Sequence, residues 1–437
     1  MNVDYFILCI ISVITIVITY VSTHYEKDRQ YKLIYLFFAF SFFMYSGVGI
    51  AIDTVSNIYI LHYSLFLFLT LFFVSVTKKF VIGAKHHSYS SKIEKTYKVQ
   101  KVERYVDEHP KVITLLTVFF LLTIVVTLIY PTNRLFLYFR PPVLSLAGIF
   151  DKQATTQNDV VLKLMQSVNV FLMPFFFIQI HSLIKKKKKL LAVLLVFFWA
   201  YSKMLSTEYM SRNEMLKIVI FIVLIATTYN EKTNEYMLSL RHYIVLGVLV
   251  LMAVPLLAAY TGYRQTGSLN IGSFEESIRY IIESECYYPE YFQRIKDTGS
   301  MISPITYFLW ILFLPIPSII WRGKPTIAIN DTFTYSMYHI TSAEATYSVS
   351  LPSLLGESFC IFGFEFFWIE AVVFGAILSL VMKWFKKYDY LRAYSLYYVV
   401  NLLTLARGGS QGYLSGLING CVGLVLFNMY ILHSYKR

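Results

Sequence analysis

The sequence predicts an all-α polytopic membrane protein. Of its 437 residues, 57% are hydrophobic and only 15% are charged, whereas about a quarter of the residues of a soluble domain are charged. Apolar runs long enough to cross a bilayer recur along the chain. The lysines and arginines fall in short blocks between these runs, which is typical of the cytoplasmic loops of membrane proteins.

We expect about eleven transmembrane helices. Most of the apolar runs approach the roughly 20 residues that a bilayer requires, although the sixth, seventh and tenth are shorter. The first run lacks the basic segment and the small-residue cleavage site of a signal peptide, so we expect it to remain as a span. The runs lie at 3–22, 33–53, 58–77, 112–130, 160–182, 190–206, 214–229, 243–260, 364–382, 391–406 and 412–433.

The basic residues predict the orientation of these spans. Five consecutive lysines at 185–189 and further blocks within 78–111 and 383–392 fall between runs on the same side of the membrane. That side takes most of the 39 lysines and arginines, so we expect it to be the cytoplasm. The N-terminus is then external and the C-terminus cytoplasmic. Since topology accounts for the net charge of +13, nothing in it indicates nucleic-acid binding.

The longest interruption of the apolar pattern is 261–363, which we expect to form one large extracytoplasmic loop. Within it, the segment 305–321 is apolar but short, and it contains Pro315 and Pro317. If it crossed the membrane, the lysines at 383–387 would lie outside. We therefore expect a re-entrant or interfacial element, which must be buried in protein or line a wet cavity. The chain divides into 1–260 with eight spans, the loop at 261–363, and 364–437 with three spans.

Three arginines on the predicted outer side adjoin spans. Arg212 lies between the sixth and seventh, Arg264 follows the eighth, and Arg407 follows the tenth. An arginine binds a phosphate through two charge-assisted hydrogen bonds, which suits a diphosphate. The adjacent Gly408 would let backbone N–H groups approach the same oxygens. The alternative for each arginine is an interfacial anchor or an ion pair.

Other basic residues of the loop are secondary candidates. Arg279 and Arg294 lie among glutamates, where ion pairs on a solvated helix are the simpler interpretation. Lys324 follows the apolar segment 305–321. It could bind a phosphate or sugar oxygen as a point charge, or extend from the membrane interface toward water.

Two residues of the loop are candidate general bases. Glu357 precedes an apolar segment, and burial there would raise its pKa toward the range of a usable base. A structural salt bridge to an arginine is an equal alternative. His339 is the second candidate, although a lone loop histidine is more often incidental. Glu365 and Glu370 fall in the ninth span, where a carboxylate is either functional or a packing element.

The sequence predicts no metal and no other cofactor. It contains no Asp-x-Asp, HExxH or Walker motif, and its four cysteines lack metal-ligand spacing. Cys286 and Cys360 would share the outer compartment and could form a disulfide. Two unpaired thiols are the simpler interpretation.

The order of these motifs resembles the bacterial oligosaccharide repeat-unit polymerases (O-antigen polymerase, Wzy type). The resemblance covers roughly 190–415 and departs from the family at Asn213, where a glycine is usual. The matching steps are Ser-Arg at 211–212 before a span, Tyr-Arg at 263–264 entering the large loop, Lys-Pro at 324–325 after a proline-rich apolar stretch, Gly-Glu at 356–357 before the next span, and Arg-Gly at 407–408.

The resemblance implies a GT-C-like architecture and glycosyl transfer at the outer face of the bacterial cytoplasmic (inner) membrane. The donor and acceptor would be undecaprenyl-diphosphate-linked repeat units of an O-antigen or capsular polysaccharide. Membrane lipids and a chain-length regulator protein are further expected partners. An O-antigen ligase, or a polytopic flippase or transporter, is the alternative, although the absence of a visible internal repeat disfavours an inverted-repeat transporter.

The resemblance also implies roles for the candidate residues. Positive charge is needed at the diphosphate as it leaves, and the acceptor hydroxyl must lose a proton. The proton acceptor would be Glu357 or His339, without metal or nucleotide. The diphosphate would be bound by Arg264 and Arg407, with Arg212 and Lys324 in support, and with Arg279, Arg294 and Gly408 as secondary candidates.

Overall fold

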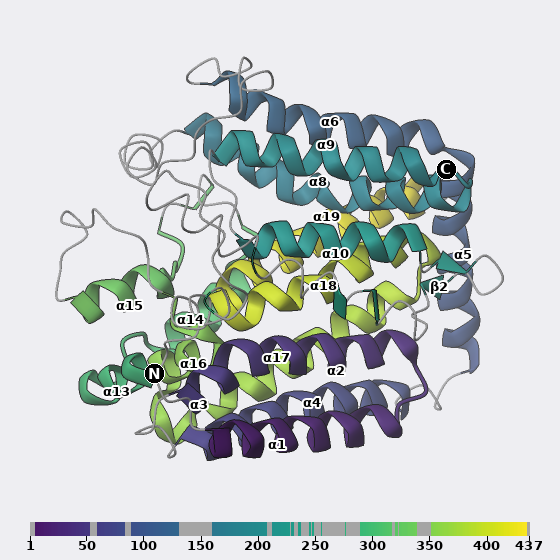
Figure 1. Cartoon of the computed structure of the whole chain (residues 1–437). Coiled ribbons are helices and arrows are strands. Elements are labelled where there is room, and N and C mark those ends of the chain that lie inside the picture. Colours follow the sequence, from purple (N-terminus) through teal and green to yellow (C-terminus); the bar gives the residue numbers. More distant parts are fainter. Residues whose placement is uncertain are drawn as a thin grey trace.

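The computed structural model is a bundle of long helices with a group of shorter helices at one end (Figure 1). It describes 5–52, 59–83, 89–130, 160–207, 212–227, 289–316, 323–338 and 351–434, together with 229–230, 235–236, 244–245, 247–248, 255, 276 and 320–321.

Seven of the described helices are long and apolar enough to cross a membrane. They coincide with seven of the predicted spans, which confirms a polytopic helical membrane protein. They are α1 (Tyr5–His24), α2 (Arg29–Phe42) continued by the π-helical η1 (Phe43–Gly47) and α3 (Val48–Ile52), α4 (Tyr59–Gly83), α6 (Pro110–Ile129), α8 (Val160–Lys185), α17 (Trp368–Lys386) and α19 (Ser410–Ser434).

Three more helices occupy predicted spans but are not among these seven. They are α9 (Lys189–Thr207), α10 (Arg212–Thr227) and α18 (Arg392–Gly408). At 17 residues, α18 is about 25 Å long, somewhat less than the roughly 30 Å of a hydrocarbon core. It is nevertheless the most enclosed helix, because α2, α8, α10, α16 and α19 all pack against it. The eighth predicted span, 243–260, lies almost wholly outside the described residues, so the count of eleven stays a prediction.

Two described elements were not expected as regular structure. The polar helix α5 (Tyr89–Glu108) lies in the basic block between the third and fourth spans and packs against α19. Strands β1 (Tyr229–Asn230) and β2 (Glu235–Tyr236) form a short antiparallel pair after α10, with Tyr229 opposite Tyr236.

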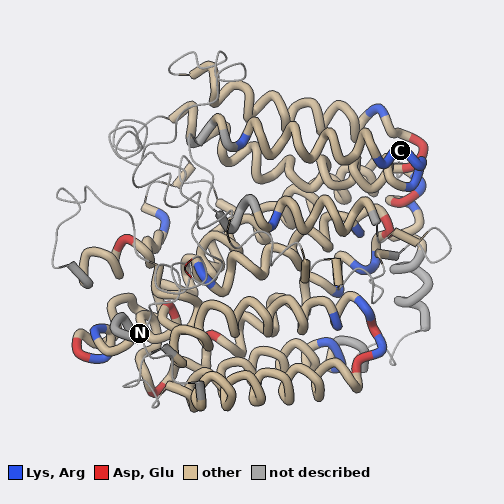
Figure 2. Tube along the Cα trace, viewed as in Figure 1, with Lys and Arg blue, Asp and Glu red and all other residues tan. Residues whose placement is uncertain are grey.

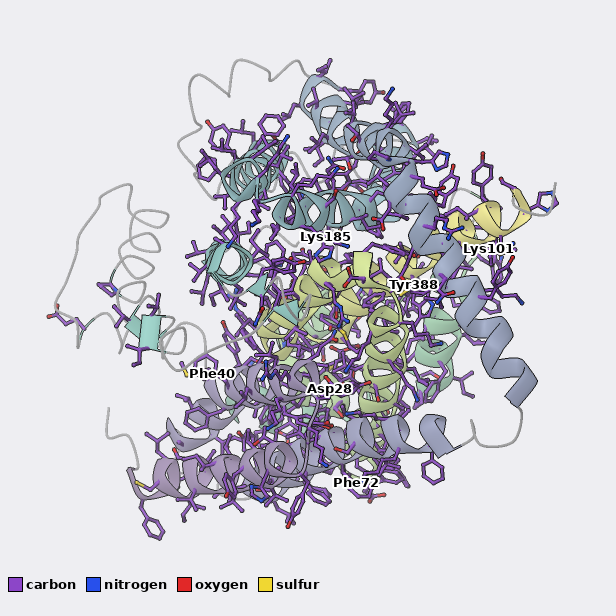
Figure 3. All side chains as sticks on the ribbon, turned by 90° about the vertical axis from the view of Figure 1, so that its right-hand side faces the viewer. Asp28, Phe40, Phe72, Lys101, Lys185 and Tyr388 are labelled. Carbon is purple, nitrogen blue, oxygen red and sulfur yellow. The ribbon has the colours of Figure 1, made fainter. Side chains whose placement is uncertain are left out.

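The outward faces of the bundle are apolar, as a lipid-facing surface requires. Phe40 on α2 and Phe72 on α4 are each nearly half exposed, and both lie at the periphery in the end-on view of Figure 3. Aromatic side chains fill the interior, where Phe177 of α8 stacks on Tyr397 of α18 with ring centroids 4.4 Å apart. Buried aromatic side chains between the helices and exposed apolar side chains on the outside are expected of a helical bundle in a membrane.

Lysines and arginines concentrate at one end of the bundle (Figure 2). The end of α8, the start of α2 and the end of α17 meet there. Ion pairs join the segment before α2 to two other helices: Lys78 of α4 lies 2.5 Å from Glu26, and Lys386 of α17 pairs with Asp28. The sequence prediction that these basic blocks share one side is thus matched by the arrangement of the helices. The compartment that this end faces stays a prediction.

Shorter helices lie at the opposite end (Figure 1). They are α13 (Pro289–Thr298), α14 (Pro304–Phe313), α15 (Ile329–Tyr338) and α16 (Ser353–Phe366). With ten residues, α14 is about 15 Å long, half of what a crossing needs. The described part of 305–321 therefore does not form a spanning helix. The predicted ninth span begins later than expected, because the helix breaks at Gly363 (φ +71°) and α17 starts at Trp368.

Candidate functional site

The carboxylate of Glu357 is bound at the beginning of α19. Its Oε2 accepts a hydrogen bond from the Ser410 amide at 2.5 Å, and its Oε1 accepts one from the Ser410 hydroxyl, also at 2.5 Å. Glu357 is 1% exposed. The first amides of a helix lack acceptors within the helix and carry partial positive charge, so a carboxylate is stabilised there.

Gly409 makes this contact possible. It adopts φ +76°, in the left-handed region, and its amide donates to the carbonyl of Leu405 at 2.9 Å, which ends α18. A Cβ at this position would overlap Glu357 Oε2. The turn 408–410 between α18 and α19 therefore has room for the carboxylate only because position 409 is glycine.

Arg407 directly precedes this turn and is half-buried in the last turn of α18. The turn thus connects two of the predicted site residues, since Glu357 holds the backbone that immediately follows Arg407. The sequence analysis expected amides near Gly408 to approach phosphate oxygens. In the structure one amide of this turn, that of Ser410, binds an anionic oxygen, and that oxygen belongs to Glu357.

A second carboxylate lies in the same cluster. The Tyr307 hydroxyl, from α14, is 3.2 Å from Glu370 Oε1 and 3.0 Å from the Ser410 hydroxyl. Glu370 is in the first turn of α17 and is fully buried, as are Tyr307 and Ser410. Four elements, α14, α16, α17 and the start of α19, therefore contribute to one buried hydrogen-bonded group. Glu365, in contrast, is exposed.

Burial raises the pKa of the Glu357 carboxyl above its ordinary value, and the two hydrogen bonds from Ser410 partly offset this rise. The sequence analysis predicted the direction of this shift and its cause. Burial also raises the pKa of the neighbouring Cys360 thiol. Among the described residues Cys360 has no disulfide partner, and Cys286 lies outside them, so the pairing of these two cysteines stays a prediction.

The remaining predicted residues are placed as follows. Arg212 is the first residue of α10, and α10 begins at the end of the bundle where α18 ends at Gly408 (Figure 1). Arg294 is on the exposed side of α13. The positions of Arg264, Arg279 and His339 lie outside the described residues.

Lys324 has a structural partner in the loop. Its ammonium donates to the carbonyls of Leu314 at 3.2 Å and Ile316 at 2.8 Å, just beyond the end of α14. Carbonyls at the end of a helix carry partial negative charge and lack amide partners, so a cation is stabilised there. The ammonium group therefore binds the backbone just after α14.

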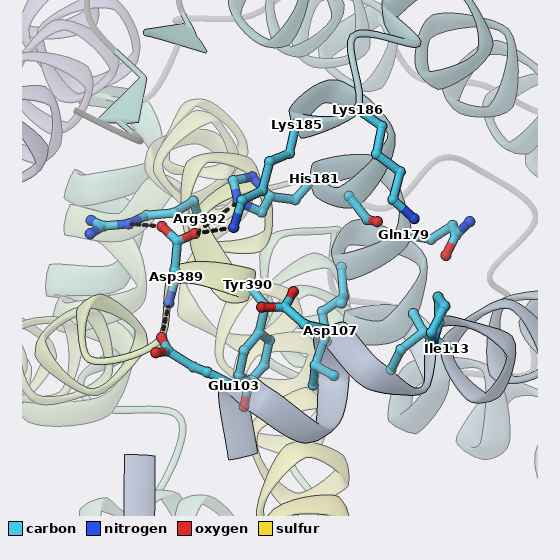
Figure 4. A pocket seen from close by; sticks show the side chains of 14 residues that line it. Glu103, Asp107, Ile113, Gln179, His181, Lys185, Lys186, Asp389, Tyr390 and Arg392 are labelled. Carbon is cyan, nitrogen blue, oxygen red and sulfur yellow. Dashed lines mark hydrogen bonds and ion pairs between the residues drawn. The ribbon is translucent and has the colours of Figure 1, made fainter. Parts of the chain in front are cut away.

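A further polar cluster surrounds Asp389 at the basic end of the bundle (Figure 4). Its carboxylate lies 3.3 Å from Lys185 Nζ, 3.7 Å from His181 Nε2 and 3.6 Å from Arg392 Nε, and its amide donates to Glu103 at 2.8 Å. These side chains line a cavity of about 750 Å³. Burial alone would raise the pKa of Asp389, but attraction from His181 and Lys185, together with the hydrogen bond from Lys185, lowers it to about 2. His181 Nε2 and Arg392 Nε have no hydrogen-bond partner among the described residues. Because Asp389 contacts Glu103 of α5 and both His181 and Lys185 of α8, we interpret the cluster as a structural connection between the α17–α18 turn and these two helices.

Sequence reasoning selected Glu357 and Arg407 but missed Tyr307, Ser410 and the need for glycine at 409. The Gly-Gly-Ser run at 408–410 between two apolar segments was a visible signal for the turn. Among the described residues, no group of three or more histidine, cysteine, aspartate or glutamate side chains is arranged to hold a metal ion.

Comparisons of the chain with protein-family models, with curated proteins and with solved structures gave no match. The residues and their geometry are therefore what a functional proposal has to rest on.

Proposed function

We propose that this protein is a glycosyltransferase that joins polyprenyl-diphosphate-linked oligosaccharide repeat units at the outer face of a bacterial cytoplasmic membrane. It would thereby polymerise an O-antigen or capsular polysaccharide. The observation that carries the proposal is the contact between Glu357 and Ser410, which brings the Gly-Glu and Arg-Gly motifs together. These are two of the motifs on which the resemblance to repeat-unit polymerases rests.

In the proposed reaction a hydroxyl oxygen of the acceptor attacks the anomeric carbon of the growing chain. The bond from that carbon to the diphosphate oxygen breaks, and the diphosphate leaves with the electron pair. Arg407, with Arg264 and Arg212 as further candidates, would neutralise the charge that develops on the leaving group. The energy comes from the diphosphate ester, so the reaction needs no nucleotide.

The proton of the acceptor hydroxyl requires a base, for which Glu357 and His339 are the candidates. In the state described, both oxygens of Glu357 accept hydrogen bonds and the residue is buried. Its first role in the proposal is therefore to position the Arg407 turn. To act as the base, it would have to be released from Ser410 when substrate binds.

The test uses purified full-length protein in lipid nanodiscs with synthetic polyprenyl-diphosphate-linked repeat units. We expect the wild type to make longer glycans, and Arg407→Ala to lower the rate by about a hundredfold, the effect of removing one donor to a developing charge. The matched control is Lys296→Ala, which removes an exposed cation from α13 at the same end of the bundle. Equal polymerisation by wild type and Arg407→Ala would refute the role of Arg407. Transfer of glycan only to a lipid A core would identify a ligase.

A second candidate function, a carrier of lipid-linked glycans, is favoured by one observation. Glu370 is fully buried in the first turn of a candidate span, and carboxylates in such positions often belong to transport or proton pathways. In liposomes a carrier would move lipid-linked units between leaflets without changing their length. Lengthened glycans in the same assay would decide for the transferase.

A further inference from the structure

The side chains of Glu370, Tyr307, Ser410 and Glu357 are linked in a row by three oxygen–oxygen contacts, and the two carboxyls also interact directly with each other. The first joins Glu370 Oε1 to the Tyr307 hydroxyl at 3.2 Å, the second joins the two hydroxyls at 3.0 Å, and the third joins the Ser410 hydroxyl to Glu357 Oε1 at 2.5 Å. All four residues are at most 1% exposed. Each contact is within hydrogen-bond distance and needs one hydrogen.

The number of hydrogens available to these three contacts determines whether a carboxyl proton is required. Each hydroxyl supplies a single hydrogen, so Tyr307 and Ser410 together supply two for three contacts. If both carboxyls were ionised, the two hydroxyls would each donate to a carboxylate. Their own contact at 3.0 Å would then hold two oxygens with no hydrogen between them.

A second carboxyl proton is not required by these contacts. Glu357 Oε2 already accepts from the Ser410 amide and cannot also carry a hydrogen toward it. Glu370 Oε2 is buried and has no hydrogen-bond partner among the described residues. The nearby Ser358 hydroxyl is bonded to the Phe367 carbonyl at 2.6 Å. One proton on the pair therefore supplies the hydrogen that the three contacts lack.

We propose that Glu357 and Glu370 form a binding site for a single proton, which they share through the hydroxyls of Tyr307 and Ser410. When the O–H bond of Glu370 breaks, its proton passes to Tyr307, the Tyr307 proton passes to Ser410, and the Ser410 proton passes to Glu357. The cluster carries one negative charge in both arrangements. This inference goes beyond the proposed glycosyl transfer and does not depend on it.

The surroundings favour the proton on Glu370. The carboxylate of Glu357 accepts two hydrogen bonds from Ser410, which stabilise its ionised form. Glu370 Oε2, in contrast, has no hydrogen-bond partner among the described residues. Other titratable or charged groups border the pair: Cys360 of α16 interacts with both carboxyls, Arg407 precedes the turn, and His62 of α4 packs on the rings of Phe359 and Phe367. Two carboxyls whose surroundings separate their proton affinities are typical of sites that exchange protons.

Infrared difference spectroscopy of the wild type and variants in nanodiscs near neutral pH tests the proposal. The absorption of a protonated carboxyl is separate from that of a carboxylate, and deuterium exchange identifies it. We expect one buried protonated carboxyl in the wild type and its complete loss in Glu370→Gln. Glu357→Gln should also abolish it, because the amide supplies the third hydrogen and allows Glu370 to ionise.

The matched control is Glu365→Gln, which removes an exposed carboxyl of α16 and should leave the band unchanged. A band unaffected by either Glu357→Gln or Glu370→Gln would mean that both carboxyls are ionised. A band halved by each substitution would mean two protons. Either result overturns the proposal. Because the infrared measurement does not require an active enzyme, it tests the proton site independently of the proposed glycosyl transfer. If one variant does not fold, the other still discriminates these outcomes.

Discussion

The amide of Ser410 lies 2.5 Å from a carboxylate oxygen of Glu357, although 53 positions separate the two residues in the chain. The contact joins α16, in the group of short helices, to the turn between two long helices of the bundle. It also fixes the backbone that follows Arg407. Each change to this contact should therefore alter both stability and the geometry of the candidate site.

Gly409→Ala should destabilise the protein. The new methyl group would overlap Glu357 Oε2 and would also force an alanine into a left-handed conformation. The conformation alone costs about 1–2 kcal/mol, and the overlap adds about 1–3 kcal/mol. Thermal unfolding in detergent measures the effect. The control is Gly412→Ala in the first turn of α19, where an added Cβ meets nothing within 4 Å. Equal melting temperatures for the two variants would contradict the geometry of the turn.

The parts of the fold that could be predicted are those whose own sequence is apolar throughout. The expected spans at 58–77 and 112–130 correspond to α4 at Tyr59–Gly83 and α6 at Pro110–Ile129. Most of α16, at Ser353–Phe366, falls in the predicted loop at 261–363, and its last residues fall in the predicted ninth span. This helix is buried because it packs against α13, α17 and α18. Contacts with helices distant in the sequence cannot be predicted from the local sequence pattern.

The candidate site shows the same limit. Glu357 and Arg407 could be selected one at a time, because charge is conspicuous in an apolar chain. Their connection depends on where α18 turns into α19, which is a property of the packed helices. Tyr307 is one of 36 tyrosines, and nothing in its local sequence distinguishes it. Only the folded chain brings its hydroxyl to Glu370 and Ser410.

The raised pKa of Glu357 predicts a specific dependence of stability on pH. Between the ordinary glutamate pKa and the raised one, the folded protein keeps one proton on the pair formed by Glu357 and Glu370, whereas the unfolded chain has released it. Stability contributed by this group should therefore fall as pH rises through that interval. Glu357→Gln stays neutral and should lack this component. Unfolding curves of both proteins between pH of about 4 and 8 test it, and parallel curves would contradict the direction of the shift.

Asp389→Asn should loosen the basic end of the bundle without affecting chemistry at the other end. The substitution removes the charge that Lys185, His181 and Arg392 share, and hydrogen bonds to charged groups contribute about 1.5–3 kcal/mol. We expect a loss near the lower limit, since the side chain is partly exposed. Glu108→Ala, an exposed acid of α5, is the control. If Asp389→Asn is fully folded and nevertheless polymerises more slowly than the wild type, the cluster has a role in function.

Substitution of Lys324 can separate its two interpretations. In the structure its ammonium donates to the Leu314 and Ile316 carbonyls, so Lys324→Met should leave both without this donor and cost about 1–3 kcal/mol of stability. Removal of a phosphate ligand would instead raise KM for the lipid-linked donor at unchanged melting temperature. Lys324→Arg keeps the charge and a donor, and should restore most of the stability. The Lys324 ammonium already donates to the two carbonyls. We therefore expect Lys324→Met to lower the melting temperature and to leave the KM of the folded protein close to that of the wild type.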